Sequence, residues 1–230
     1  MFKISDIIVP NDKDIRQIAS VRRPSFDRAN SIIVGNKVDV AACFIGDSIT
    51  ESFEVGAYFH DFGIVINRGI GFDTLKHTNC RLEADLLQLK PGVGVFMCGI
   101  NDIGPLWRKH IDGKEITEED YDKTVNGMNE QYDEIFAKCA MAKQKMIFCS
   151  IMPVGVDDVQ NPCVRRVNEH IKELCKKYSY SYADYYSALV DDNGLLKDVT
   201  FGDLLHPHVE GYNIMAEVIR PILKKCLGER

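Results

Sequence analysis

The sequence predicts a three-layer α/β domain in which helices cover both faces of a mainly parallel, five-stranded sheet. Five short apolar runs alternate with longer amphipathic segments along the 230 residues. The runs are apolar at successive positions, which indicates strands buried on both faces, as in parallel sheets. Strands that alternate with helices through right-handed crossovers form a doubly wound sheet. No linker-like segment divides the chain, so we expect one domain over residues 1–230.

The strands and helices can be placed in order from local signals. Strands are predicted at 38–45, 63–67, 93–98, 145–151 and 180–185. Helices are predicted at about 12–30, 74–89, 117–143, 162–178 and 209–227. Pro91-Gly92 punctuates the chain before the third strand, and Pro153 ends the fourth. Thr117 and Asp120 form a capping motif at the start of the third helix, after a long polar connection.

Composition and charge narrow the class of protein. Hydrophobic residues make up 45% of the chain, charged residues 27%, and the formal net charge is −6. The negative charge argues against nucleic acid and anionic membranes as partners. The longest apolar runs are far too short to cross a bilayer, and the N-terminus lacks an apolar signal core. We therefore expect a cytoplasmic protein with a small-molecule substrate and leave homo-oligomerisation open.

Eight cysteines raise the question of disulfides or a metal site. No C-x-x-C spacing occurs, and a chain of this size needs no covalent staples. Cys43, Cys98 and Cys149 lie in apolar runs predicted as strands. We expect reduced cysteines that pack as small hydrophobes, with neither a metal nor a cofactor.

Gly46-Asp47-Ser48 is the most informative segment of the chain. It follows directly on the predicted strand 38–45. A turn at that point places the serine hydroxyl at the carboxyl edge of the sheet, where open α/β sheets bind their ligands. Ser48 is therefore a candidate nucleophile, which requires a base, an orienting acid and oxyanion donors.

Asp203 and His206 form a second candidate pair in a loop just before the last helix. An aspartate three residues before a histidine can accept from Nδ1–H, so that Nε2 is left to take a proton from serine. The alternative is that Asp203 caps the last helix and His206 is a surface residue. Together with Ser48, the catalytic interpretation is favoured. His208 is the second candidate base, although its position indicates a surface residue near the helix start.

Two further segments can supply oxyanion donors. Asn101 follows the third strand, and Gly99 before it allows a sharp turn. The alternative is that Asn101 only forms a turn or caps a helix. The loop 67–74 follows the second strand and can offer a backbone N–H, or it can simply be a glycine-rich loop whose Asp73 or Thr74 caps a helix. It lacks the third glycine of a dinucleotide-binding fingerprint.

These four segments, in this order, resemble the SGNH or GDSL hydrolase superfamily. They are Gly46-Asp47-Ser48, residues 67–74, Gly99-Ile100-Asn101-Asp102 and Asp203-Leu204-Leu205-His206. The resemblance covers most of the chain and implies a flavodoxin-like sandwich that hydrolyses esters without a metal. It also implies the roles of the residues: Ser48 is the nucleophile and donates its N–H, Asn101 donates its amide, His206 is the base and Asp203 orients it.

The chain departs from this family at one position. The second block of the family usually contains Gly-Asp-Thr, with the glycine N–H in the oxyanion hole, whereas this chain has Phe72 before Asp73-Thr74. Phe72 can still donate its N–H if its φ is negative. Alternatively, Gly71 takes the role through a shifted loop. In either case Phe72 is expected to narrow the acyl pocket.

We therefore expect a serine esterase with a short acyl group, acetyl on a carbohydrate or a similar small substrate. Asp47, Phe53 and Trp107 are the predicted substrate contacts. If the protein is an enzyme of another kind, the alternative is a thioesterase or lysophospholipase, which would need an apolar acyl groove built from Phe53, Phe72 and Trp107. If the protein is not an enzyme, the alternative is a flavodoxin-like binding module whose oxyanion hole is disrupted by Phe72.

Overall fold

The computed structural model describes residues 8, 17–156 and 159–228, and these contain one five-stranded sheet. The strand order is β2-β1-β3-β4-β5, and each neighbouring pair is parallel. This order is that of flavodoxin-like doubly wound folds. The predicted fold class is confirmed, and the sheet is parallel throughout. The strands are β1 (Val40–Gly46), β2 (Ile64–Gly69), β3 (Val93–Met97), β4 (Met146–Cys149) and β5 (Ser181–Ala183).

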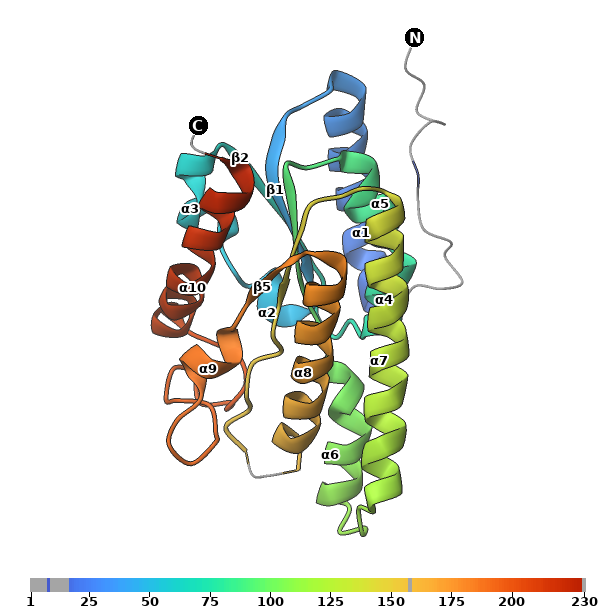
Figure 1. Cartoon of the computed structure of the whole chain (residues 1–230), viewed down its shortest axis with the longest axis vertical. Helices are drawn as coiled ribbons and strands as arrows, with labels where there is room; N and C mark the ends of the chain where they lie inside the picture. Colours follow the sequence, from blue (N-terminus) through green and yellow to red (C-terminus); the bar gives the residue numbers. More distant parts are fainter. Residues whose placement is uncertain (1–7, 9–16, 157–158, 229–230) are drawn as a thin grey trace.

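Helices cover both faces of the sheet (Figure 1). One side carries α1 (Gln17–Asn36), α4 (Leu75–Cys80), α5 (Leu82–Asp85), α7 (Glu118–Met141) and α8 (Asn161–Tyr178). The opposite side carries α3 (Val55–Tyr58) and α10 (Val209–Leu227), with α9 (Tyr185–Leu189) packed beside α10. Two short helices, α2 (Ser48–Glu51) and α6 (Gly104–Ile111), follow β1 and β3. The 3₁₀ turns are η3 (His60–Phe62), η4 (Leu87–Leu89) and η5 (Ile100–Ile103).

The burial of each strand follows its place in the sheet. Every residue of β1, β3 and β4 is buried, because each of these strands has neighbours on both sides and helices on both faces. The edge strand β2 starts exposed and becomes buried only at its carboxyl end. Only the last residue of β5 is fully buried. The continuous apolar runs in the sequence therefore correspond to the three central strands.

Three predicted connections or helices need correction. The helix predicted at 74–89 is broken into α4, α5 and η4, and the first break falls at Arg81. The connection predicted as polar contains α6, whose Pro105 stands in the first turn, where a helix tolerates proline, and whose Leu106 is buried. Helix α1 runs six residues past its predicted end, to Asn36, and its predicted first residues, 12–16, lie outside the described residues.

The predicted capping motif at the start of α7 is confirmed. Thr117 Oγ1 accepts the Asp120 N–H at 3.3 Å, and the Asp120 carboxylate accepts the Thr117 N–H at 2.8 Å, so the capping motif is present. All eight cysteines are free, and burial raises the pKa of Cys43 and Cys149 to about 12. Over the described residues, no helix has both the length and the apolar character needed to span a membrane.

Candidate active site

Ser48 lies at the first position of α2, immediately beyond the end of β1. The turn depends on Gly46, since a Cβ there would lie 1.9 Å from the carbonyl oxygen of Met97. Asp47 caps the helix, because its side chain accepts the Ile49 N–H at 3.1 Å. The cap and the glycine together turn the chain sharply and leave Ser48 partly exposed at the carboxyl edge of the sheet.

The predicted base and acid, which lie more than 150 residues later in the sequence, are close to this serine in the fold. Ser48 Oγ lies 2.9 Å from His206 Nε2, and His206 Nδ1 lies 2.6 Å from Asp203 Oδ2. Asp203 Oδ1 also accepts the backbone N–H of His206 at 2.9 Å and that of Leu205 at 3.1 Å. The carboxylate therefore holds both the ring and the backbone of His206. This geometry leaves Nε2 facing the serine hydroxyl, as proton transfer from serine requires.

The acid of this relay is half-exposed. The side chains of Asp203 and His206 are 48% and 37% exposed. Desolvation acts to raise the pKa of Asp203, but the hydrogen bonds from the His206 backbone and ring outweigh it and hold that pKa below its ordinary value. Asp203 is therefore ionised at neutral pH and can stabilise a protonated imidazole ring.

His208, the second candidate base, has a different role. It is the N-cap of α10, and its Nδ1 accepts the Glu210 N–H at 3.2 Å. Its ring packs edge-on against Phe201, with the ring centroids 5.8 Å apart. The expectation that His208 lies at the helix start is confirmed.

Asn101 lies in η5, directly after β3, and its side chain points toward the loop 70–74. Gly99 has a φ of +134°, a conformation that favours glycine, and it turns the chain at this point. Asn101 Nδ2 donates to the carbonyl oxygen of Asp73 at 2.9 Å. An amide nitrogen carries two protons, so this bond orients the side chain and uses only one of them.

Both candidates for the backbone donor differ from what the sequence predicted. The Gly71 N–H donates to the carboxylate of Glu51, so the donor of the shifted-loop alternative is already hydrogen-bonded. Phe72 has a φ of +63° and is 60% exposed, so the condition of a negative φ is not met. Glycine adopts this left-handed region without cost, which explains why glycine is usual here in the family that the sequence resembles. The condition that the sequence analysis set for Phe72 is therefore contradicted.

The structure places two of the three predicted substrate contacts inside the protein. Asp47 is buried and serves as a helix cap, and burial raises its pKa to about 7. Phe53 is 2% exposed and stacks on Tyr212, with the ring centroids 4.9 Å apart. Both predictions are wrong, because these side chains pack inside the protein. Trp107 lies on α6 and stacks on His110 at 5.5 Å; it is part-buried, and its role at the site stays a prediction.

Three side chains near the site have roles that the sequence did not indicate. Glu51 holds the Gly71 N–H and pairs with Arg22. Tyr212 donates from its hydroxyl to the carbonyl oxygen of Ile49 at 2.9 Å and so ties α10 to α2. Arg81 is fully buried between the strand ends. None has a local signal: Arg81, four residues before Asp85, looks like half of an exposed helical ion pair.

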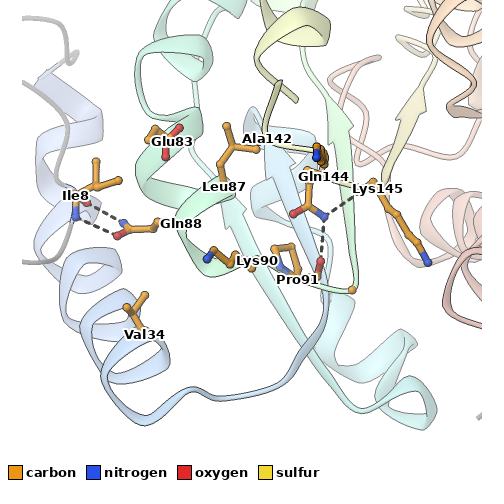
Figure 2. A pocket seen from close by; sticks show the side chains of 12 residues that line it. Ile8, Val34, Glu83, Leu87, Gln88, Lys90, Pro91, Ala142, Gln144 and Lys145 are labelled. Carbon is orange, nitrogen blue, oxygen red and sulfur yellow. Dashed lines mark hydrogen bonds between the residues drawn. The ribbon is translucent and has the colours of Figure 1, made fainter. Parts of the chain in front are cut away.

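A separate cavity of about 670 Å³ lies away from Ser48, where the chain enters β3 and β4 (Figure 2). Gln88 there exchanges hydrogen bonds with the backbone of Ile8, and Gln144 donates to the carbonyl oxygen of Pro91. None of its lining residues belongs to the predicted site. In the part of the chain that the structure describes, no group of three or more histidine, cysteine, aspartate or glutamate side chains is placed to hold a metal ion.

At the carboxyl edge of this doubly wound α/β sandwich, a serine is hydrogen-bonded to a histidine, which is hydrogen-bonded to an aspartate. Serine hydrolases use this arrangement. Comparison with known families agrees with that class. The GDSL-like Lipase/Acylhydrolase family matches residues 44–214, which include Ser48, Asn101, Asp203 and His206. The chain belongs to this family and is a carboxylic ester hydrolase.

Individual relatives are distant. An acetylxylan esterase from Geobacillus stearothermophilus is 24% identical over 208 residues, which covers 75% of this chain and 89% of the relative. Among solved structures, a protein described as a putative platelet activating factor from Streptococcus pneumonia has a TM-score of 0.73 at 21% identity, and the match covers 90% of this chain and 94% of that one. A putative acylhydrolase from Bacteroides fragilis has a TM-score of 0.69 at 21% identity, with 87% and 97% covered. At these identities, the structural likeness supports the fold alone.

Proposed function

We propose that this protein is a serine esterase that works through an acyl-enzyme, with Ser48 as nucleophile, His206 as general base and Asp203 as orienting acid. The observation that carries the proposal is the pair of distances, 2.9 Å from Ser48 Oγ to His206 Nε2 and 2.6 Å from His206 Nδ1 to Asp203. Both fall within the range of hydrogen bonds that transfer or orient a proton.

The reaction follows from this geometry. His206 Nε2 takes the proton of Ser48 as Oγ attacks the ester carbonyl, and the imidazolium is stabilised by Asp203. His206 then returns the proton to the leaving alcohol as the ester C–O bond breaks. A water molecule attacks the acyl-enzyme, with His206 again as base, and the acid is released. The oxyanion of each tetrahedral intermediate accepts from the Ser48 N–H, the second amide proton of Asn101 and a backbone N–H of Gly71 or Phe72.

The proposed acyl group is short, and acetyl on a carbohydrate is our first choice of substrate. Phe72 directly follows Gly71, where an added Cβ would lie 3.9 Å from Ser48 Cβ, so the backbone of this loop lies close to the nucleophile turn. A bulky ring at that position limits the length of an acyl chain. The acetylxylan esterase relative adds weight to this choice. We expect the enzyme to act in the cytoplasm on small esters, with neither nucleic acid nor a membrane as partner, and Trp107 remains a candidate substrate contact.

The alternatives differ in what they require. A thioesterase or lysophospholipase needs an apolar groove for a long acyl chain, and Phe53, one of its three candidate walls, is buried in the core. A non-catalytic binding module does not agree with membership of a hydrolase family or with the hydrogen bond between Ser48 and His206.

The test is a series of p-nitrophenyl esters of increasing acyl length, together with acetate release from acetylated xylan. We expect the highest kcat/KM with the acetyl ester. Ser48→Ala should lose about 10⁴-fold or more in kcat, whereas Ser31→Ala, which alters a partly buried hydroxyl on α1, should behave as wild type. A maximum at eight carbons or more would favour the long-chain alternative. Turnover near the wild-type rate by a folded Ser48→Ala variant would overturn the mechanism.

A further inference from the structure

We propose that Arg81 is a positioning residue that holds the nucleophile turn and the oxyanion loop at a fixed separation. The inference rests on the proposed function, because it assigns Arg81 a part in the geometry of that same site. Arg81 touches neither the substrate nor the reacting atoms. It acts through the backbone and side-chain groups that carry them.

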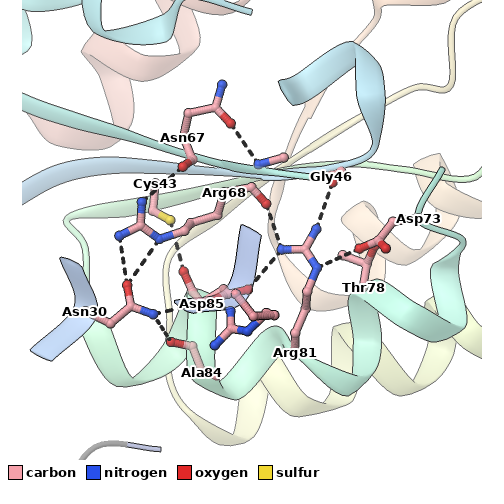
Figure 3. Close-up of polar contacts among 12 residues, drawn as sticks. Asn30, Cys43, Gly46, Asn67, Arg68, Asp73, Thr78, Arg81, Ala84 and Asp85 are labelled. Carbon is pink, nitrogen blue, oxygen red and sulfur yellow. Dashed lines mark hydrogen bonds and ion pairs between the residues drawn. The ribbon is translucent and has the colours of Figure 1, made fainter. Parts of the chain in front are cut away.

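The guanidinium of Arg81 joins four segments that are separate in the sequence (Figure 3). Its Nε donates to Asp73 Oδ2 at 2.6 Å, and its Nη2 donates to the carbonyl oxygen of Gly46 at 2.8 Å. Its Nη1 donates to the carbonyl oxygen of Arg68 at 2.7 Å and to Asp85 Oδ2 at 3.1 Å. One planar group therefore bonds to the end of β1, the end of β2, the loop after β2 and helix α5.

Two of these partners lead directly to the reacting groups. Gly46 is the last residue of β1 and stands two positions before Ser48, so its carbonyl fixes the base of the nucleophile turn. Asp73 follows Phe72, and its backbone carbonyl accepts the amide of Asn101. Arg81 thus bridges the turn that carries the nucleophile and the loop that orients the oxyanion donors. A displacement of about 1 Å at such a site can lower the rate about 10²-fold.

The charge and shape of Arg81 suit this bridge. The side chain is 2% exposed, and Asp73 and Asp85 are as deeply buried. Desolvation acts to lower the pKa of Arg81, but these two carboxylates outweigh it and raise that pKa above its ordinary value. The planar fork of arginine can bond to four acceptors in different directions, whereas the ammonium of lysine has three donors on a single atom.

Arg23 provides a matched control in the same buried network. It is 4% exposed on α1 and, like Arg81, pairs with Asp85; its other partner is Asp27. These bonds connect α1 to α5, and neither partner belongs to the turn before Ser48 or to the loop 70–74. Loss of the Arg23 fork should therefore cost stability, while the bonds of Arg81 to Gly46, Arg68 and Asp73, which hold the catalytic loops, remain.

The experiment compares Arg81→Lys with Arg23→Lys, since both changes keep the charge and remove the fork. The kinetics use p-nitrophenyl acetate, and a thermal melt of each protein shows the temperature range in which it is folded. We expect both variants to melt lower than wild type. Arg81→Lys should lose about 10²-fold in kcat, with KM changed less than threefold, whereas Arg23→Lys should keep kcat within threefold. A folded Arg81→Lys with wild-type kcat, or equal losses in both variants, would overturn the proposal.

A second pair of variants covers the case in which Arg81→Lys does not fold. Asp73→Asn keeps an oxygen that accepts from Arg81 Nε, and Asp73→Ala removes it. We expect kcat to fall from wild type to Asp73→Asn and again to Asp73→Ala, at constant KM; equal kcat in both variants would contradict the proposal. Ser48→Ala is measured alongside. If Ser48→Ala is active, the proposed function fails; if it is inactive and Arg81→Lys is as fast as wild type, only the role of Arg81 fails.

Discussion

Asp203→Asn gives the sharpest test of the proposed relay. The substitution keeps the size of the side chain and one acceptor oxygen but removes the charge. Asp203 meets His206 through the ring Nδ1 at 2.6 Å and the backbone N–H at 2.9 Å. The asparagine can still accept one of these bonds, so the loop should keep its shape while the imidazolium loses its counter-charge.

The size of the effect follows from the exposure of this pair. Two opposite unit charges about 4 Å apart attract by about 1 kcal/mol in water and about 4 kcal/mol near a protein surface of lower effective dielectric constant. Asp203 and His206 are 48% and 37% exposed, so their attraction lies between the value in water and the value near a protein surface. Each 1.4 kcal/mol corresponds to about tenfold in rate, so these limits predict that kcat/KM falls by about 5- to 10³-fold. A fully buried acid would have a larger effect, about 10⁴-fold.

The assay is the pH dependence of kcat/KM with p-nitrophenyl acetate. Protonated His206 cannot accept the serine proton, so activity should fall toward acid pH in the wild type. In Asp203→Asn kcat/KM should fall at every pH of the series, because the carboxylate no longer stabilises the imidazolium formed in the reaction. Asp198→Asn, which alters an exposed carboxylate five residues earlier, is the control. An Asp203→Asn variant within twofold of wild type, with the same pH profile, would show that Asp203 only caps the loop and that the reasoning is wrong.

Four further outcomes are expected. Ser48→Ala should lose about 10⁴-fold or more in kcat and should no longer be labelled by an organophosphonate, as mass spectrometry can establish. Asn101→Ala should lose about 10²- to 10³-fold in kcat with little change in KM; a lower melting temperature with unchanged kcat would instead identify a turn former. Phe72→Gly should raise the ratio of kcat/KM for butyrate esters to kcat/KM for acetate esters several-fold, and an unchanged ratio would exclude Phe72 from the acyl pocket. The stability should change little, because glycine relieves the left-handed strain but adds freedom to the unfolded chain, and each effect is about 1 kcal/mol. Burial raises the pKa of Asp47 from 3.8 to about 7, so the folded state binds the extra proton and the free energy of unfolding should fall as pH rises from about 4 to 7. Asp47→Asn, which still caps α2, should remove that decline in urea titrations, and an identical decline in both proteins would assign it to other groups.

The sequence alone was sufficient wherever the signal was local. The three central strands are continuous apolar runs because they are buried on both faces, so their positions and the parallel α/β class could be predicted from neighbouring residues. The candidate site could be predicted for a related reason. Ser48 and Asn101 each lie within four residues of the end of a strand. Parallel strands bring their carboxyl ends to one edge of the sheet, so these residues could be expected to lie near one another.

Only the tertiary structure decided what depends on contacts between distant segments. The Gly71 N–H is engaged by Glu51, twenty residues away, and Phe53 is covered by Tyr212 of α10. No local pattern encodes either contact. Arg81 is the clearest case, because a charged side chain in a helical segment is normally exposed. It is buried here because two carboxylates and two strand-end carbonyls surround it, and those partners assemble around the guanidinium only when the sheet has formed.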